Sequence, residues 1–236
     1  MSLFRFKQFE INHDKSTLKM GTDAVLLGAW TPIPEKCHHI LDIGSGCGVI
    51  TLMLAQRSNA NVMGVDIDKL SVDEAIENAN KSPYKNRIEF INMSIQDFCT
   101  SQRKNNFDLI VSNPPFFVDS LKSPVYKRNI GRHTDTLPFE ELILAVNYCL
   151  SSFGLFAIII PLTTKDIIQT LCKNQGLFCT NILQIQPLEN KPVNRVIMLF
   201  SREEKSLQIE NLIIRDADMK YTHSYQLLTK DFYLKF

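Results

Sequence analysis

The feature that most constrains the fold is an alternation of two kinds of segment between residues 38 and 200. Short apolar runs rich in Ile and Val alternate there with segments whose apolar residues recur at helical spacing. This order is typical of a parallel sheet that is covered by helices on both faces. We expect strands at 39–43, 61–65, 87–91, 107–111 and 155–160, and helices at 49–57, 71–81 and 139–150.

The pattern changes after Pro161. A helix is predicted at 163–174, with Gly176 at its C-terminal cap, and two strand-like runs follow at 178–186 and 193–201. Only six residues separate these runs, which is too few for a crossover helix, so the two strands should pair antiparallel. The predicted fold class is therefore α/β, with a mostly parallel sheet that ends in an antiparallel hairpin.

Two further segments flank this region. Residues 1–35 combine alternating aromatic and basic residues with a short apolar helix at 24–30, and residues 206–236 contain a strand-like run at 212–214. The sequence contains no internal repeat, low-complexity stretch or linker. We expect one domain spanning 1–236, with residues 1–35 as an N-terminal cap and residues 206–236 as a C-terminal tail packed on it.

The composition excludes several classes of protein. Of 236 residues, 44% are hydrophobic and 22% are charged, which excludes an intrinsically disordered chain. The formal net charge of +1 argues against a protein that coats nucleic acid. The longest apolar stretch, 155–162, is less than half of the roughly 18 to 20 residues that a membrane span needs. We expect no membrane contact and no export signal.

The cysteines and histidines indicate neither a metal site nor a disulfide framework. The six cysteines form no C-x-x-C pair, and the five histidines form no H-x-x-x-H or H-E-x-x-H pattern. We therefore expect no bound metal and a reducing compartment, the cytoplasm.

The strongest local signal is a glycine-rich segment after the first predicted strand. Gly44, Gly46 and Gly48 follow Asp42 with the spacing G-x-G-x-G and open the helix at 49–57. Glycines permit a tight turn and the close approach of a ligand. The spacing differs from the dinucleotide pattern G-x-G-x-x-G, and the Asp42 carboxylate would repel a pyrophosphate, so a cationic or zwitterionic ligand is favoured. The alternative is a glycine-rich turn without a ligand.

Acidic residues follow the next two strands. Asp66 lies about 20 residues after the glycine loop, the usual position of the residue that binds the two hydroxyls of a ribose. Asp68 is more typical of a helix N-cap. Asp97, after the third strand, is a candidate acceptor for an exocyclic amine, with a solvated turn as the alternative.

The decisive element follows the fourth strand and reads Asn113-Pro114-Pro115-Phe116. Ligands of open α/β sheets bind beyond the carboxyl ends of the strands, near the point where the strand order reverses. The prolines remove two N–H donors, so the Asn113 side-chain oxygen and the Pro114 carbonyl form two acceptors that suit an –NH2 group. The Phe116 ring offers a face on which a planar base can stack. The alternative is a rigid turn.

A basic segment comes directly after this element. Residues 119–135 contain four Lys or Arg against two Asp, a net charge of +2 with His neutral. Such a segment is either a solvated face or a contact with phosphates, and its position beside the predicted base pocket favours phosphates. Its candidate contact residues are Lys122, Lys127, Arg128, Arg132 and His133.

Several of these motifs together resemble those of the Rossmann-like methyltransferases that use S-adenosylmethionine and methylate exocyclic amino nitrogens. The shared motifs are DIGSGCG at 42–48, VDID at 65–68 and NPPF at 113–116. The flanks resemble more narrowly the bacterial tRNA adenine-N6 methyltransferases that modify a valine tRNA next to its anticodon. The segments that carry this similarity are FKQF at 6–9, His13-Asp14, KMGTDAVLLGAW at 19–30, Gly131-Arg132-His133 and the tail 221–233.

The resemblance implies a Rossmann-like sheet of seven strands, five or so of them parallel, with helices on both faces. It also implies S-adenosylmethionine as methyl donor, S-adenosylhomocysteine as product, and tRNA as partner, with methylation at N6 of adenine 37. In this family a Gly-Thr-Asp segment closes over the methionine end of the cofactor, a role that falls here to Thr22 and Asp23.

The expected site therefore has three overlapping sets of residues. The catalytic set is Asn113, Pro114 and Phe116; the cofactor set is Thr22, Asp23, Asp42, Gly44, Gly46, Gly48, Asp66, Asp97 and Asn113; the substrate set is Phe116 with the basic residues of 119–135. We expect a monomer. The alternatives are a guanine-N2 methyltransferase of ribosomal RNA, a protein-glutamine methyltransferase, and a non-catalytic RNA-binding subunit.

Overall fold

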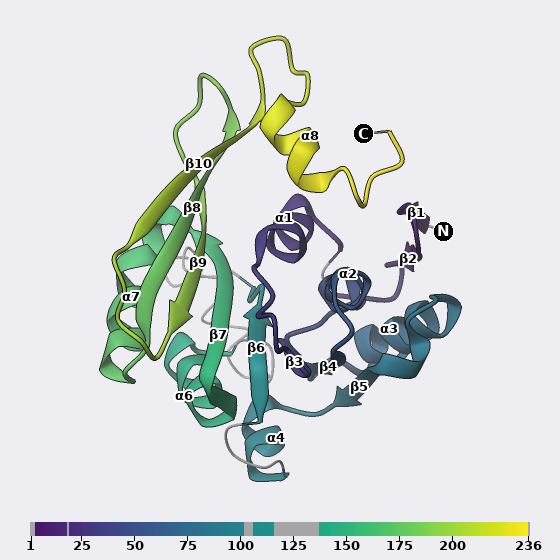
Figure 1. Cartoon of the computed structure of the whole chain (residues 1–236). Helices are drawn as coiled ribbons and strands as arrows, with labels where there is room; N and C mark the ends of the chain where they lie inside the picture. Colours follow the sequence, from purple (N-terminus) through teal and green to yellow (C-terminus); the bar gives the residue numbers. More distant parts are fainter. Residues whose placement is uncertain (1–2, 18, 102–105, 116–136, 236) are drawn as a thin grey trace, which may run out of the picture.

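The computed structural model describes residues 3–17, 19–101, 106–115 and 137–235 (Figure 1). Its main sheet has eight strands: β3 (His39–Ile43), β4 (Asn61–Asp66), β5 (Ile88–Asn92), β6 (Phe107–Ser112), β7 (Leu150–Pro161), β8 (Phe178–Leu188), β9 (Arg195–Ser201) and β10 (Gln208–Arg215). Their order across the sheet is β10-β8-β9-β7-β6-β3-β4-β5. Strand β9 is antiparallel to both of its neighbours, and the other neighbouring pairs are parallel.

The predicted α/β fold is confirmed, with one strand more than expected. The run expected at 212–214 belongs to β10, which pairs parallel with β8 along the sheet edge. The short connection 202–207 carries the chain past β8 to that edge. Strand β7 also begins earlier than predicted, at Leu150, directly after the preceding helix.

Helices cover both faces of the sheet. Helices α1 (Thr22–Trp30), α2 (Val49–Arg57) and α3 (Lys69–Lys81) lie on one face, and α4 (Ile95–Ser101), α6 (Phe139–Cys149) and α7 (Lys165–Asn174) lie on the other (Figure 1). Short 3-10 turns, η1 (Lys85–Arg87) and η3 (Leu162–Thr164), precede β5 and α7.

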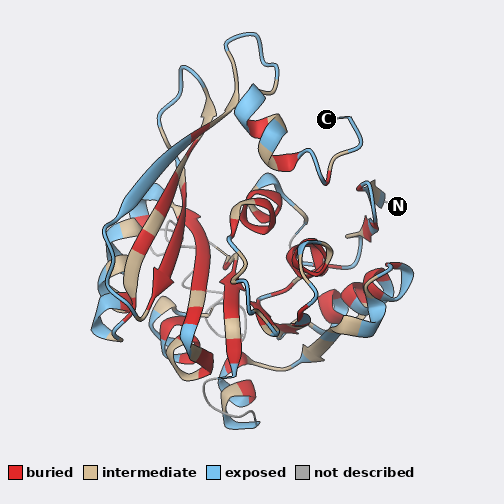
Figure 2. Ribbon diagram, in the orientation of Figure 1, coloured by how far each residue is buried: buried red, intermediate tan, exposed pale blue. Residues whose placement is uncertain are grey.

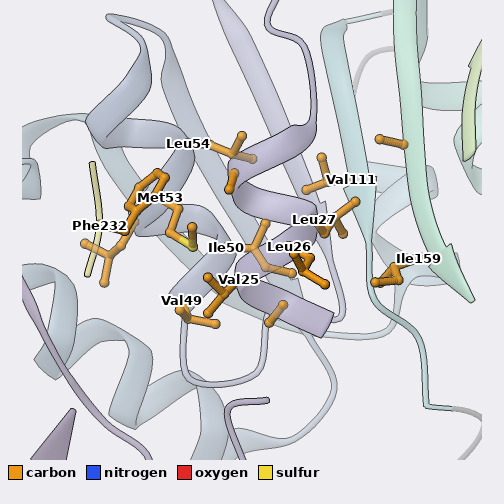
Figure 3. Packing of buried hydrophobic residues seen from close by; sticks show 14 of the residues in the cluster. Val25, Leu26, Leu27, Val49, Ile50, Met53, Leu54, Val111, Ile159 and Phe232 are labelled. Atoms are coloured by element: carbon orange, nitrogen blue, oxygen red, sulfur yellow. The ribbon is translucent and has the colours of Figure 1, made fainter. Parts of the chain in front are cut away.

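The buried residues separate into two clusters because side chains alternate along each strand. In β6, Leu109 and Val111 belong to the cluster under α1 and α2, whereas Ile110 belongs to the cluster under α6. Figure 2 shows that buried residues, in red, fill the central strands and the helix faces that cover them. Figure 3 shows Leu27 of α1 beside Val111.

The two ends of the chain lie side by side. The hairpin of β1 (Leu3–Arg5) and β2 (Glu10–Asn12) lies next to the segment that follows α8 (His223–Thr229) (Figure 1). Phe6 forms an antiparallel bridge with Tyr233, and the Lys7 N–H donates to the Phe232 carbonyl at 2.8 Å. Phe6 and Phe232 are buried in the cluster of α1 and α2. The assignment of residues 1–236 to one domain stays a prediction.

Candidate active site

The candidate site lies at the point where the strand order reverses. From β3 the chain continues to β4 and β5 on one side and then returns to β6 on the other. Ile43 and Ser112, the last residues of β3 and β6, pair directly, and the Ser112 hydroxyl donates to the Ile43 carbonyl at 2.9 Å. The glycine loop and the Asn113-Pro114-Pro115 loop therefore leave the same edge from neighbouring strands, as ligand sites of open α/β sheets do.

The glycine loop has the backbone that its sequence predicts. Gly44, Gly46 and Gly48 have φ values of +74°, +53° and +83°, which residues with a side chain rarely adopt. A Cβ on Gly44 or Gly46 would meet no atom within 4 Å, so open space borders both residues. Gly48 is different, because a Cβ there would lie 2.7 Å from the Phe90 ring. Gly44 and Gly46 thus border open space at the end of β3, and Gly48 permits close packing.

Asp42 lies beneath this loop and is fully buried. Its Oδ2 accepts a hydrogen bond from the Thr51 hydroxyl at 2.7 Å, whereas Oδ1 has no partner among the described residues. Burial raises the pKa of Asp42 to about 7, against the lowering effect of the Thr51 hydrogen bond. The Ser45 hydroxyl is also buried without a described partner. Buried polar atoms are normally paired, so these two suit a ligand that brings donors or positive charge.

Asp66 joins the end of β4 to the glycine loop. Its Oδ2 accepts from the Gly46 N–H at 2.8 Å and its Oδ1 accepts from the Asp68 N–H at 2.9 Å. Burial raises the pKa of Asp66, although these backbone hydrogen bonds act against the shift. Each carboxylate oxygen retains acceptor capacity for a hydroxyl. The arrangement fits the predicted ribose contact, which stays a prediction.

An apolar surface that we did not predict lies next to Asp66. Ile67 is 52% exposed and Leu70 is 57% exposed, beyond the end of β4. Exposed aliphatic side chains beside Asp66, the predicted ribose contact, would suit the flat face of a planar base. The sequence signal was the apolar residue between the two acids of Val65-Asp66-Ile67-Asp68. Asp68 is the N-cap of α3, as predicted, and accepts from the Leu70 N–H at 3.2 Å.

Asp97 has local partners at the beginning of α4. Its Oδ2 accepts from the Ser94 hydroxyl at 2.7 Å, and its N–H donates to Ser94 Oγ at 3.1 Å. Asp97 is exposed. This geometry supports the solvated-turn alternative, and the contact with an exocyclic amine stays a prediction.

The loop after β6 places only part of the predicted catalytic set. Asn113 is half-buried and Pro114 is buried, directly beyond the strand end. The remaining residues of the catalytic and substrate sets lie outside the described residues: Phe116, Lys122, Lys127, Arg128, Arg132 and His133. Their roles stay predictions.

Thr22 and Asp23 begin α1, which packs over the strands that carry the site. Thr22 is exposed, and Asp23 Oδ2 accepts from Arg195 Nε at 3.0 Å. Sequence reasoning missed Arg195, because 172 positions separate the two residues and no local pattern marks the pair.

The segment that leads into α1 is fastened to α3 by two buried polar residues. Glu74 accepts hydrogen bonds from the backbone N–H groups of residues 14, 15 and 16. The Asn78 amide donates to the Asn12 and Cys47 carbonyls, so it ties the same segment to the glycine loop. Both residues were missed. The available signal was a polar pair four residues apart on the helix stripe that carries Ala75 and Ala79.

The described residues include neither a metal-type cluster nor a membrane-spanning helix. No cluster of three or more His, Cys, Asp or Glu side chains there could hold a metal ion. None of the described helices is both long enough and apolar enough to span a bilayer.

Comparisons with solved structures show the fold. A predicted O-methyltransferase from Agrobacterium tumefaciens superimposes with a TM-score of 0.70 at 19% identity, over 89% of this chain and 96% of that chain. TYW2 from Pyrococcus horikoshii, solved in complex with MeSAdo, gives a TM-score of 0.60 at 15% identity, over 84% of this chain and 69% of that chain. The chain therefore has the Rossmann-like fold of these solved structures.

Sequence comparisons show the family. Residues 34–215 match a family model described as a methyltransferase domain. A tRNA1(Val) (adenine(37)-N6)-methyltransferase from Bacteroides fragilis is 43% identical over 235 residues, 98% of each chain. A protein of the same name from Flavobacterium psychrophilum is 38% identical, over 99% of this chain and 100% of that protein. The chain belongs to the family of the tRNA1(Val) (adenine(37)-N6)-methyltransferases.

Proposed function

We propose that this protein transfers a methyl group from S-adenosylmethionine to the exocyclic N6 of adenine 37 in tRNA1(Val). The observation that carries the proposal is the position of Asn113-Pro114 beside the glycine loop, where the strand order reverses. The chain that has this arrangement matches such enzymes over nearly its full length. The product of the methyl donor is S-adenosylhomocysteine. We further propose that the protein acts as a cytoplasmic monomer.

The residues at the edge of the sheet fit the methyl donor. Gly44 and Gly46 border open space, and Asp42 Oδ1, which has no partner among the described residues, suits a cationic group. Asp66 would bind the ribose hydroxyls, and Ile67 would lie against the adenine. Thr22 and Asp23 would cover the methionine end, and Asp97 is retained as a proposed contact of the adenine amine.

Two acceptors would prepare the target nitrogen. Bound S-adenosylmethionine supplies an electrophilic methyl group on a sulfonium. The nitrogen of an adenine amine is a poor nucleophile because its lone pair is delocalised into the ring. The Asn113 side-chain oxygen and the Pro114 carbonyl would accept its two N–H groups and favour a more tetrahedral, electron-rich nitrogen. These hydrogen bonds strengthen as positive charge develops, which lowers the barrier by differential binding.

The tRNA would reach this pair of acceptors with its target base unstacked. Bases in single-stranded loops are unstacked at low cost, which suits a position next to the anticodon. Phe116 would stack on the base, and Lys122, Lys127, Arg128, Arg132 and His133 would contact phosphates. No metal ion is needed in this scheme, because the sulfonium is itself the electrophile.

The other candidate functions receive less support. The relatives over the full chain are named as adenine-N6 enzymes, which disfavours a guanine or glutamine substrate. A non-catalytic subunit is disfavoured because the chain keeps both the glycine loop and the Asn-Pro-Pro sequence, which such a subunit would not need.

The experiment is methylation of two transcripts of tRNA1(Val) that differ only at nucleotide 37. With labelled S-adenosylmethionine, we expect N6-methyladenosine in the transcript with adenine at position 37 and no label in the transcript with guanine there. Label in N2-methylguanosine, or equal label in both transcripts, would contradict the proposal.

A further inference from the structure

An ion pair joins the beginning of α1 to the beginning of β9. Arg195 Nε lies 3.0 Å from Asp23 Oδ2. The two side chains are 32% and 30% exposed. A pair this close to solvent adds little to folding stability. Its position relative to the candidate site is therefore the more informative property.

The register of the sheet puts Arg195 at the same edge as the Asn113-Pro114 loop. Arg195 pairs with Pro161 at the end of β7, and Ile158 of β7 pairs with Ser112 at the end of β6. Asn113 follows Ser112 directly. Arg195 is thus two strands away from the loop, roughly 10 Å across the sheet at the usual strand spacing.

Both partners of the ion pair are carried by rigid elements. Next to Arg195, the Asn194 carbonyl accepts from the Leu162 N–H and the Asn194 N–H donates to the Ile185 carbonyl, both at 3.1 Å. Helix α1 buries residues 24–29 on the sheet, and Figure 3 shows Leu26 and Leu27 on the side of Ile159 and Val111. The ion pair therefore fixes the side chain of Asp23 rather than the path of the backbone.

We infer that Arg195 is a positioning residue for the cofactor, which acts through Asp23. It holds Asp23 Oδ2 and leaves Oδ1 to accept from the cationic amino group at the methionine end of the cofactor. The inference rests on the proposed function, in which Gly21-Thr22-Asp23 covers that end. A carboxylate that is already held loses less rotamer freedom when the ligand binds, so the affinity is higher.

The test is a double-mutant cycle on the affinity for S-adenosylhomocysteine, measured by calorimetry on the full chain. We expect Arg195→Gln to weaken binding about 5- to 10-fold, the effect of freeing one ordered side chain. Asp23→Asn should weaken binding at least as much. The double variant should bind like Asp23→Asn alone, because Arg195 affects the cofactor only through the Asp23 carboxylate.

Four further measurements complete the test. Arg195→Lys keeps the charge but loses the planar donor, and we expect an intermediate affinity. Lys205→Gln is the matched control, since it removes the exposed Lys205–Glu203 pair, and its affinity should equal that of the wild type. Urea unfolding checks that each variant is folded. Affinity for tRNA1(Val), measured separately, should be unchanged in Arg195→Gln.

Two results would overturn the inference. If the affinity loss of the double variant equals the product of the two single losses, Arg195 acts independently of Asp23. A loss of tRNA affinity with unchanged S-adenosylhomocysteine affinity would make Arg195 an RNA contact instead. If the wild type binds S-adenosylhomocysteine but does not methylate tRNA1(Val), the proposed function fails while the cycle still decides the role of Arg195.

Discussion

Replacing Glu74 by Gln tests whether the segment before α1 is held by a buried carboxylate. Glu74 is 1% exposed. Its Oε1 accepts from the N–H groups of Asp14 at 2.8 Å and Lys15 at 2.9 Å. Its Oε2 accepts from the N–H and the hydroxyl of Ser16, at 2.9 and 2.5 Å. A glutamine keeps one of these two oxygens. In place of the other oxygen it has an –NH2 group, which faces the groups that donate to that oxygen in the wild type.

The magnitude follows from the two hydrogen bonds that the amide cannot make. Hydrogen bonds to a charged group contribute about 1.5 to 3 kcal/mol each, and the freed donors can partly turn to water. We expect Glu74→Gln to lower the free energy of unfolding by about 3 kcal/mol, measured by urea denaturation at pH 7. Amide exchange at residues 14–16 should accelerate in the same variant.

Glu77→Gln is the matched control on the same helix. Glu77 forms an exposed ion pair with Lys15 at 2.7 Å, so its loss should lower the free energy of unfolding by less than about 1 kcal/mol. Equal losses in the two variants would refute the account, because they would show that burial and the number of hydrogen bonds do not matter here.

The pH dependence gives a second check on the same carboxylate. Burial alone would raise the pKa of Glu74, but the hydrogen bonds outweigh it and hold the pKa below the ordinary value of 4.5. The stabilisation is therefore complete above pH 4.5 and is lost as the pH falls through the folded-state pKa. The difference in unfolding free energy between the wild type and Glu74→Gln should shrink over that range and stay constant above it.

The remaining predictions concern the cofactor and the RNA. Asn113→Ala should lower the single-turnover rate of methyl transfer roughly 100-fold or more with nearly unchanged affinity for S-adenosylhomocysteine, and Asn113→Asp should be milder. A wild-type rate in Asn113→Ala would exclude the two-acceptor mechanism. Asp66→Ala should weaken S-adenosylhomocysteine binding by about 1.5 to 3 kcal/mol in calorimetry, and unchanged affinity would remove Asp66 from the site. Because burial raises the pKa of Asp42 to about 7, the free protein should lose stability as the pH rises from 4 to 7. S-adenosylhomocysteine should bind more tightly as the pH rises through 7, and below that pH its binding should release a proton. Asp42→Asn should abolish both trends, and an unaltered pH profile in that variant would contradict the assignment. Neutralising any two of Lys122, Lys127, Arg128 and Arg132 should weaken tRNA binding and flatten its salt dependence, and an unchanged salt slope would mean a solvated face.

The central strands and helices were predictable because their periodicity and their burial agree. Strand β3 and helix α2 lie at the predicted bounds, since a short Ile-rich run and a glycine loop leave little choice there. Strand β10 was seen only in part. Its first four residues, 208–211, are exposed at the sheet edge, and a single isoleucine among three polar residues gives no apolar alternation to recognise.

The gathering of the candidate site residues at one edge was predictable where each of them directly follows a strand. The glycine loop, Asp66 and Asn113 each follow a strand, and parallel strands bring those ends to one edge. Arg195 was not predictable in this way, because its partner Asp23 comes from the other end of the chain. Ion pairs between distant segments depend on tertiary packing, which no local spacing records.

Helix α3 carries several of the side chains that hold the segments around the candidate site. Asp68, at the N-terminus of this helix, accepts from the Thr17 hydroxyl, and Glu74 and Asn78 hold residues 12–16 further along it. The same helix begins three residues after Asp66, and Asn78 also contacts the glycine loop through the Cys47 carbonyl. The proposed ribose acid, the loop and the segment leading to Thr22 and Asp23 therefore share one rigid support. A shift of α3 moves all three parts together, so substitutions on its buried face should change cofactor affinity even though they touch no cofactor.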